Sequence, residues 1–216
     1  MSVRNGAQIM KKAAILTDRF DRALLYAMHV HGGQVRKGTS TPYVAHLFAV
    51  AATVIEYGGD EDLAIAGLLH DCVEDQGGKP RLADVKGRFG ERVATVVEAC
   101  SDSLANTAAG EPKQDWQTRK EAYISHLLDA DEDIIRVSLA DKVHNARAIL
   151  RDLRTPDIGE GIWSCFSVPK ERTLWYYSSL AKAFVDVLGR KSDDRLGNLK
   201  QLALELGEIV RALEAS

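Results

Sequence analysis

The sequence predicts an all-α fold, and three observations support this prediction. Apolar residues recur with helical periodicity along most of the 216 residues, whereas alternating runs of β-branched residues, which are typical of strands, are few. Glycine pairs at 32–33 and 58–59 end two of the periodic segments. The chain contains no internal repeat and no linker of disordered composition. We therefore expect one domain over residues 1–216, a bundle of roughly nine to ten helices. In chain order, the predicted helices span residues 18–30, 44–57, 61–73, 82–89, 91–100, 115–128, 131–153, 170–188 and 196–212.

The early helices are delimited by glycines and by a capping residue. The first ends before Gly32 and the second ends at Gly58. Asp60 can cap the third, because its side-chain oxygen accepts hydrogen bonds from the first free N–H groups. Residues 63–69 of that helix are apolar nearly all round, which is typical of a helix inside a core.

Turn-forming and polar stretches separate the later helices. Residues 76–80 hold two glycines and a proline and predict a turn. Residues 101–111 are small and polar and predict a mobile loop. Residues 155–168 hold a proline and two glycines and predict a long connection before the last two helices.

Composition excludes several classes of protein. Apolar residues make up 45% and charged residues 27% of the chain, as in ordinary soluble globular proteins. A net charge of −3 without a basic stripe does not suggest a nucleic-acid partner. The absence of a long apolar run argues against a membrane partner. Cys72, Cys100 and Cys165 form no metal-binding pair, so we expect a cytoplasmic protein. The oligomeric state is not indicated.

Four potential metal ligands interrupt apolar segments of predicted helices: His46, His70, Asp71 and Asp141. A lone histidine in a helix is more often a hydrogen-bonded core residue, and a His-Asp pair can arise by chance. The spaced His46 and Asp141 favour a metal site, because buried charges are costly unless they are paired or metal-bound. Two imidazoles and two carboxylates suit Mn²⁺, Fe²⁺ or Zn²⁺ better than Mg²⁺ or Ca²⁺.

Two further carboxylates follow the His-Asp pair. Glu74 lies four residues after His70, and Asp75 lies four residues after Asp71, so each pair shares a helix face. Glu74 and Asp75 could orient an attacking water, take its proton or protonate a leaving oxygen. The alternative is that they end the helix facing solvent.

Basic and polar residues around these segments are candidates for substrate binding. Arg36 and Lys37 precede His46 in a loop and could clamp a phosphate or a base, although a charge pair in a loop is usually solvated surface. Asn145 lies one turn beyond Asp141 and could contact substrate.

Residues near these candidates carry expectations of their own. Arg147 could brace the site through a carboxylate, and His144 is expected to support a ligand or to be a packing residue, and not to be a ligand itself. Arg172 and Tyr176 lie one turn apart and could border a nucleotide pocket, with Trp175 in the core.

Together these motifs resemble the HD-domain phosphohydrolases, and within them the hydrolase domain of the RelA/SpoT alarmone enzymes. The matching segments are residues 31–37, 42–46, 68–75, 89–93 and 139–147. The resemblance implies a single HD-type helical bundle over residues 1–216 that acts as a stand-alone small alarmone hydrolase. It implies a Mn²⁺ site formed by His46, His70, Asp71 and Asp141.

The resemblance also implies a reaction. Glu74 and Asp75 would manage the water that removes the 3′-pyrophosphate of ppGpp, giving GDP and pyrophosphate. The residues implied to lie near the nucleotide are Arg36, Lys37, Asn145, Arg172 and Tyr176.

The substrate is the part of this expectation that has alternatives. Residues 38–41 form a longer loop than the family's, and this loop borders the base. An adenine alarmone such as (p)ppApp, NADPH through its 2′-phosphate, or a nucleoside monophosphate is the alternative substrate. A regulatory module with a dead site is a third possibility, against which the intact acidic and imidazole groups argue.

Overall fold

The computed structural model describes residues 15–191 and 196–216. These residues form ten α-helices, two 3₁₀ helices and no strand, apart from an isolated bridge between Val35 and Pro42. The all-α prediction is therefore confirmed. The helices are α1 (Asp18–Val30), α2 (Val44–Glu56), α3 (Glu61–Leu69), α4 (Cys72–Gln76), α5 (Gly78–Phe89), α6 (Glu91–Cys100), η1 (Thr107–Ala109), α7 (Trp116–Asp129), α8 (Glu132–Arg154), η2 (Gly159–Cys165), α9 (Lys170–Gly189) and α10 (Gly197–Glu214).

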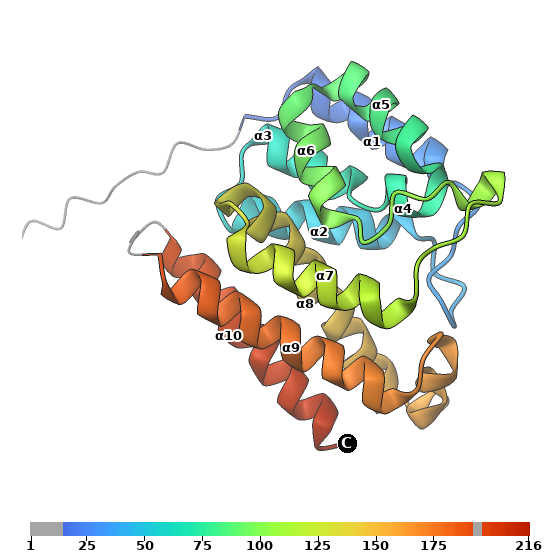
Figure 1. The fold of residues 1–216 in the computed structure, drawn as a ribbon, viewed down its shortest axis with the longest axis vertical. Coiled ribbons are helices and arrows are strands. Elements are labelled where there is room, and N and C mark those ends of the chain that lie inside the picture. The colour runs from blue at the N-terminus through green and yellow to red at the C-terminus, as the bar shows by residue number, and fades with distance from the viewer. Residues whose placement is uncertain (1–14, 192–195) are drawn as a thin grey trace, which may run out of the picture.

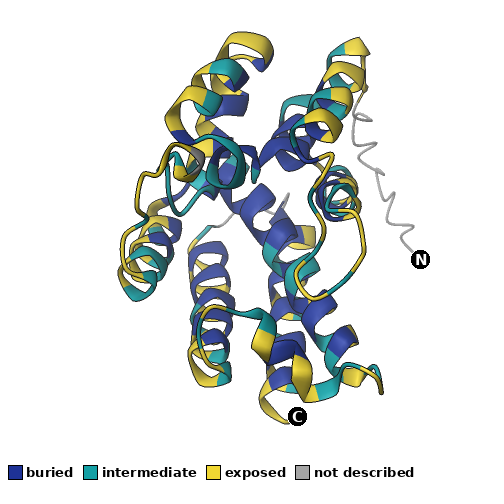
Figure 2. Ribbon diagram, turned by 90° about the vertical axis from the view of Figure 1, so that its right-hand side faces the viewer, coloured by how far each residue is buried: buried dark blue, intermediate teal, exposed yellow. Residues whose placement is uncertain are grey.

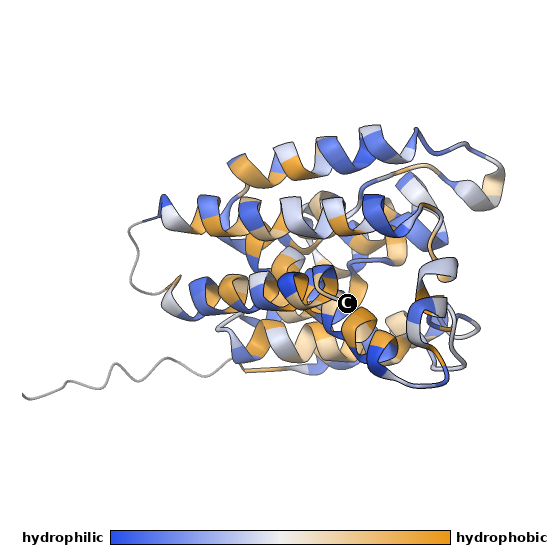
Figure 3. Ribbon diagram, turned by 90° about the horizontal axis from the view of Figure 1, so that it is seen from below, coloured by the Kyte–Doolittle hydropathy of each residue, from blue (hydrophilic) through white to orange (hydrophobic). Residues whose placement is uncertain are grey.

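Helix α8 is the centre of the bundle. It packs against α2, α3 and α6 on the N-terminal side of the molecule and against α9 and α10 on the C-terminal side. Figure 1 shows these two groups as the blue-green and the orange-red ends of the fold. The buried residues lie on the faces that the helices turn toward one another (Figure 2), and these faces carry much of the apolar surface (Figure 3). Within the described residues, no helix has the length and apolarity needed to cross a bilayer.

Side-chain caps begin four of the α-helices. Thr17 accepts a hydrogen bond from the Arg19 N–H at the start of α1. Asp60, Asp115 and Asp131 cap α3, α7 and α8 in the same way. Each cap satisfies N–H groups that have no partner inside the helix, so the local sequence fixes where these helices begin.

The core helix α3 approaches α2 closely because Gly67 has no side chain. A Cβ atom at Gly67 would lie 3.1 Å from the Ala51 Cα atom. Every residue of α3 from Leu63 to Leu69 is buried, as the apolar run predicted. The close contact brings the start of α2 and the end of α3, which carry His46 and His70, to the same point.

Two helix boundaries differ from the prediction. The predicted helix 61–73 is broken, because His70 and Asp71 form a turn between α3 and α4. The His70 Nδ1 atom donates to the Gly67 carbonyl at 2.8 Å, and this carbonyl would otherwise accept the next helical N–H. The predicted turn 76–80 is also shorter than expected, since α5 begins at Gly78. Pro80 fits in its first turn, where a proline removes no helical hydrogen bond.

Candidate active site

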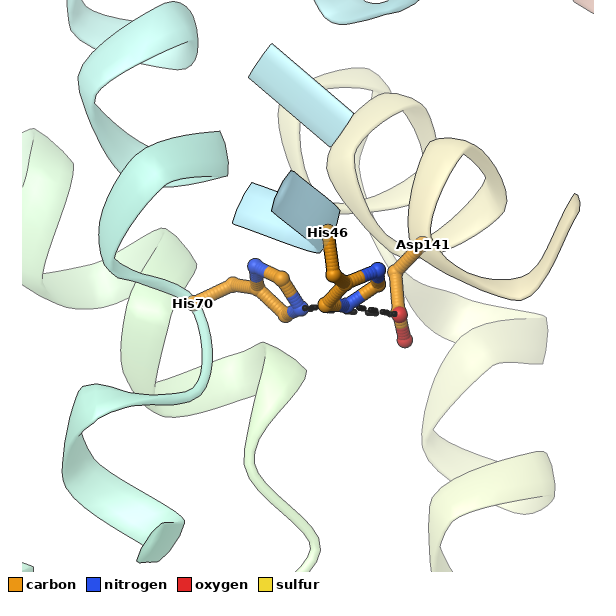
Figure 4. Close-up of side chains that lie close together, drawn as sticks. All are labelled: His46, His70 and Asp141. Carbon is orange, nitrogen blue, oxygen red and sulfur yellow. Dashed lines mark hydrogen bonds and ion pairs between the residues drawn. The ribbon is translucent and has the colours of Figure 1, made fainter. Parts of the chain in front are cut away.

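Three helices bring four side chains to one point between α2, α3 and α8. His46 lies in the first turn of α2, His70 follows α3, and Asp141 lies midway along α8 (Figure 4). The His46 Nε2 atom lies 3.2 Å from His70 Nε2 and 3.2 Å from Asp141 Oδ1. All three side chains are buried. His46 and Asp141, the two of these residues that lie farthest apart in the sequence, are therefore direct neighbours in the fold.

Asp71 completes this group. Its Oδ2 atom lies 2.9 Å from His70 Nε2 and 3.5 Å from His46 Nε2. The Tyr43 hydroxyl donates to the same oxygen at 2.5 Å and holds the carboxylate in place. We call His46, His70, Asp71 and Asp141 the HD cluster.

The spacing of the HD cluster fits a metal ion. Metal–nitrogen and metal–oxygen bonds of about 2.1 Å place neighbouring ligand atoms about 3.0–3.4 Å apart. The five distances among these nitrogen and oxygen atoms range from 2.9 to 3.5 Å. The ligand atoms of His46, His70 and Asp141 all lie within 4.8 Å of one another, so a single ion can reach these three side chains, and Asp71 lies beside both imidazoles.

Hydrogen bonds outside the cluster orient both imidazoles toward such an ion. The Gly67 carbonyl can only accept, so His70 Nδ1 carries a proton and the neutral ring points its Nε2 lone pair inward. His46 Nδ1 lies 2.8 Å from His144 Nδ1. Burial, and after it His46, lower the pKa of His144 to about 4, so the neutral His144 Nδ1 can accept a hydrogen bond from His46 Nδ1–H. Both His46 and His70 are thus oriented as metal-binding histidines usually are.

The charge balance of the HD cluster calls for a cation. Although burial raises the pKa of Asp141, Lys142 and the two imidazoles outweigh burial and hold that pKa well below its ordinary value. Burial lowers the pKa of His70, but Asp71 and Asp141 outweigh burial and raise it well above its ordinary value. Two ionised carboxylates thus face two imidazole nitrogens, and either protons or a metal ion must lie between them.

A cavity of about 400 Å³ opens beside the HD cluster. Its volume suits a nucleotide-sized molecule, and it has an apolar side formed partly by Ile162 and Phe166. The polar residues on its wall include all but one of the further site residues that the sequence predicted. These are Arg36, Lys37, Glu74, Asp75, Asn145 and Tyr176.

Glu74 and Asp75 line this cavity and are half-buried. Lys113 Nζ donates to Glu74 Oε1 at 3.0 Å, and the Asp102 N–H donates to Glu74 Oε2. Burial, and after it Asp102, raise the pKa of Glu74. Burial, and after it Asp71, raise the pKa of Asp75, whose Oδ2 atom accepts from Gln34. Raised pKa values bring both carboxyls closer to neutral pH, where proton transfer is most effective.

Asn145 connects the HD cluster to the segment between α1 and α2 that carries Arg36 and Lys37, which we call the basic loop. Its amide donates to Asp141 Oδ1 at 2.5 Å and its carbonyl accepts from Arg36 Nη2 at 2.9 Å. The Arg36 guanidinium also lies 5.8 Å from the centre of the Tyr43 ring. Lys37 lines the cavity with an exposed side chain. The loop therefore holds its two cations at the cavity mouth.

The candidate residues of α9 lie in different places relative to the cavity. Tyr176 lines the cavity, whereas Arg172 lies outside the lining, over the Trp116 ring and bonded to Gln117. The prediction of a core position for Trp175 is wrong, since this side chain is exposed.

Arg147 does not brace the site. It pairs with Glu205 of α10, because it lies on the α8 face that is turned toward that helix.

Sequence reasoning missed a group of charges on the cavity wall. Lys142 Nζ donates to Asp141 Oδ2 at 2.7 Å. Lys120 forms an ion pair with Asp102, which also pairs with Arg119. Lys142 follows Asp141 directly in a buried run, so its position in the sequence could have identified it as a partner of the site. The positions of Asp102 and Lys120 in the sequence give no such signal. Asp102 lies in a loop and Lys120 lies in a separate helix, so only the fold brings them together.

Comparison with known proteins gives one family for most of the chain. The profile of the HD domain matches residues 23–167. A guanosine-3′,5′-bis(diphosphate) 3′-pyrophosphohydrolase of Aquifex aeolicus is 35% identical over 134 residues, which are 61% of this chain and 18% of that protein. A GTP pyrophosphokinase of Streptomyces coelicolor is 34% identical over 131 residues, 61% of this chain and 15% of that protein. The chain thus spans less than a fifth of these relatives.

A solved structure matches along nearly the whole chain. It is a metazoan ortholog of SpoT that hydrolyses ppGpp, with a TM-score of 0.65 and 29% sequence identity. The match covers 92% of this chain and 97% of that protein. The similarity therefore extends beyond the family profile, which ends at residue 167.

Proposed function

We propose that this chain, which belongs to the HD-domain family, hydrolyses the 3′-pyrophosphate of ppGpp to give GDP and pyrophosphate in a metal-dependent reaction. The observation that carries the proposal is the HD cluster beside Glu74 and Asp75, in one cavity with the basic loop. The similarity to a ppGpp-hydrolysing protein over almost its full length supports the choice of substrate.

The HD cluster would hold the metal ion. His46 and His70 offer lone pairs, and Asp71 and Asp141 offer carboxylate oxygens. We propose Mn²⁺, with Fe²⁺ or Zn²⁺ as substitutes, because this mixed set of nitrogen and oxygen ligands suits all three. The bound ion would supply Lewis acidity and lower the pKa of a water molecule.

Glu74 and Asp75 would move the protons. In the reaction a water oxygen bonds to phosphorus, the bond from phosphorus to the ribose 3′-oxygen breaks, and a proton ends on that oxygen. One carboxylate takes the water's proton, and a carboxyl with a raised pKa can supply a proton to the leaving oxygen. Their neighbours Lys113 and Gln34 hold them toward the cavity.

The basic loop would position the nucleotide. Arg36 is fixed by Asn145, which also touches the ligand Asp141. A guanidinium presents several donors to phosphate oxygens or to a base edge. Arg172 would act from the rim of the cavity if it acts at all, since Gln117 and Trp116 engage it. We also propose a cytoplasmic location, consistent with three free cysteines.

Chromatography of the reaction products tests the proposal. Purified protein is loaded with Mn²⁺ and incubated with ppGpp, ppApp and NADPH in parallel. We expect GDP and pyrophosphate from ppGpp in equal amounts, and no product after the metal is removed with a chelator. Metal analysis of the purified protein identifies the native ion.

The variant Asp133→Asn is the matched control. Asp133 lies on α8 like Asp141, but pairs with Arg92 at the surface, so this variant should keep full activity. Orthophosphate as the only phosphate product of ppGpp would mean that another bond is cleaved and would contradict the proposed reaction. Turnover of NADPH or ppApp alone would replace ppGpp by another phosphorylated nucleotide. A protein that turns over none of the three substrates contradicts the proposed activity.

A further inference from the structure

Gln34 lies in the basic loop beside the end of α4, and both ends of its side-chain amide are hydrogen-bonded. Its Nε2 atom donates to Asp75 Oδ2 at 2.8 Å. Its Oε1 atom lies 2.7 Å from His31 Nδ1 and accepts from Gln76 Nε2 at 3.0 Å. The main chain of Gln34 is fixed as well, because its N–H donates to the His31 carbonyl and its carbonyl accepts from the Tyr43 N–H. The amide therefore has a defined place next to Asp75.

The chemistry of these neighbours decides which way the amide faces. An ionised carboxylate can only accept a hydrogen bond, so the NH₂ group of Gln34 must face Asp75. The amide oxygen then faces His31 and needs a donor there. Burial, the largest influence, lowers the pKa of His31, so the ring is neutral and carries one proton. That proton lies on Nδ1, because a proton on Nε2 would leave a buried N–H without a partner among the described residues.

His31 is buried and stacked, and one of its two ring nitrogens is left over. The residue is 1% exposed, and its ring lies 5.3 Å from the Tyr43 ring at an angle of 22°. Its Nε2 atom is buried without a hydrogen-bond partner among the described residues, which is unfavourable. A phenyl ring would stack on Tyr43 without this cost, but it would offer no donor. The bond to Gln34, and not packing, therefore accounts for a histidine at this position.

We propose that His31 and Gln34 are positioning residues for Asp75. The His31 N–H fixes the Gln34 amide, and the amide holds Asp75 Oδ2, so that Oδ1 is the oxygen that meets the attacking water or the leaving group. The proposal deepens the proposed function and rests on it. Gln34 lines the cavity, whereas His31 is absent from the lining formed by the described residues. His31 would therefore act on the reaction through Gln34.

The expected size of the effect follows from the sensitivity of proton transfer to geometry. A carboxyl group that acts as acid or base contributes about 100-fold to 10,000-fold in rate, and a misplacement of about 1 Å can cost about 100-fold. Without the Gln34 bond, Asp75 is still present but its carboxylate can rotate. We therefore expect a partial loss of kcat, with KM and metal content little changed.

Two variants of His31 test the proposal because they should separate activity from stability. His31→Phe keeps the stacked ring and removes the donor, so kcat should fall at least about tenfold while the melting temperature does not fall. His31→Asn keeps an N–H donor near the place of Nδ1 and loses the ring. It should lower the melting temperature through the cavity it leaves, and keep kcat within about threefold. Rates are expressed per bound Mn²⁺, because Tyr43 also donates to the ligand Asp71.

Gln34→Leu is the second test and does not depend on how the His31 site repacks. It removes the donor to Asp75, so kcat should fall at least about tenfold, with KM within about twofold. The matched controls are His29→Phe and Gln201→Leu, since both residues are exposed, and each should keep full kcat. If kcat follows the melting temperature in the two His31 variants, or if Gln34→Leu keeps full kcat, the positioning role is overturned.

An NMR measurement tests the same contacts without any substrate. In ¹⁵N-labelled protein, the Gln34 side-chain amide signal is identified as the one that is lost in Gln34→Leu. This signal should shift in Asp75→Ala and in His31→Phe, and shift less in His31→Asn. An amide signal that Asp75→Ala leaves in place contradicts the positioning role, even if ppGpp is hydrolysed. If the wild type turns over none of ppGpp, ppApp and NADPH, the proposed function fails, while the amide signal still decides whether His31 and Gln34 hold Asp75.

Discussion

The HD cluster and the basic loop lie on the same cavity but are held in different ways. The cluster comes from three packed helix segments, and His46 and His70 are each only 1% exposed. The loop is held by the bridge between Val35 and Pro42 and by contact with η2. At Gly38, where φ is +73°, an added Cβ atom would collide with the Cys165 sulfur.

Under the proposed function, the HD cluster carries the chemistry and the loop recognises the nucleotide. A change in the cluster disturbs the packed centre of the fold, because its residues are also part of helix interfaces. A change in the loop leaves this packing in place and would alter the contacts to the nucleotide. Asn145 is the link between the two regions, since it bonds both Asp141 and Arg36.

The largest effect is expected for Asp141→Ala. This variant removes a metal ligand and leaves Lys142 buried without its carboxylate, so we expect loss of turnover and of bound metal. Breaking such a buried pair should lower the free energy of unfolding by about 3–5 kcal/mol. Metal analysis, activity and denaturant unfolding measure the three effects. Normal metal content with full activity would remove Asp141 from the site.

A smaller effect, confined to binding, is expected for Arg36→Ala. The loss of a charge-assisted contact should raise the KM for ppGpp about tenfold, with kcat within about twofold and metal content unchanged. Steady-state kinetics and metal analysis check this, with the surface variant Arg22→Ala as the control. If kcat and metal content fall together instead, Asn145 couples the two regions, and the HD cluster and the basic loop do not have separate roles.

The smallest effect is expected for Lys113→Met, and it appears in the pH profile. Lys113 lowers the pKa of Glu74, against burial and Asp102, which raise it, and Lys120 lowers it further. Without Lys113 the carboxyl ionises only at higher pH, so the acidic limb of kcat/KM should move to higher pH. Lys79→Met, at an exposed position, should not move it. A limb that stays in place would show that Glu74 does not act as the base.

Much of the fold could be predicted because its signals are local. Caps such as Asp60 and Asp131 lie immediately before their helices, and glycine pairs follow others. The break at His70 was missed because it depends on a side-chain bond to the Gly67 carbonyl. Trp175 was misplaced because periodicity does not say whether a neighbouring helix covers a given face.

The helical fold and the four proposed metal ligands could be inferred from the sequence alone. His46, His70, Asp71 and Asp141 interrupt apolar segments, and polar groups in such positions need a partner or an ion. The pairing of the other charges depends on how the helices pack. Lys120 and Asp102 meet because α7 lies against the loop before η1, and the Tyr176 hydroxyl has no partner among the described residues because of what surrounds it in space. Such contacts join residues far apart in the chain, so no local pattern records them.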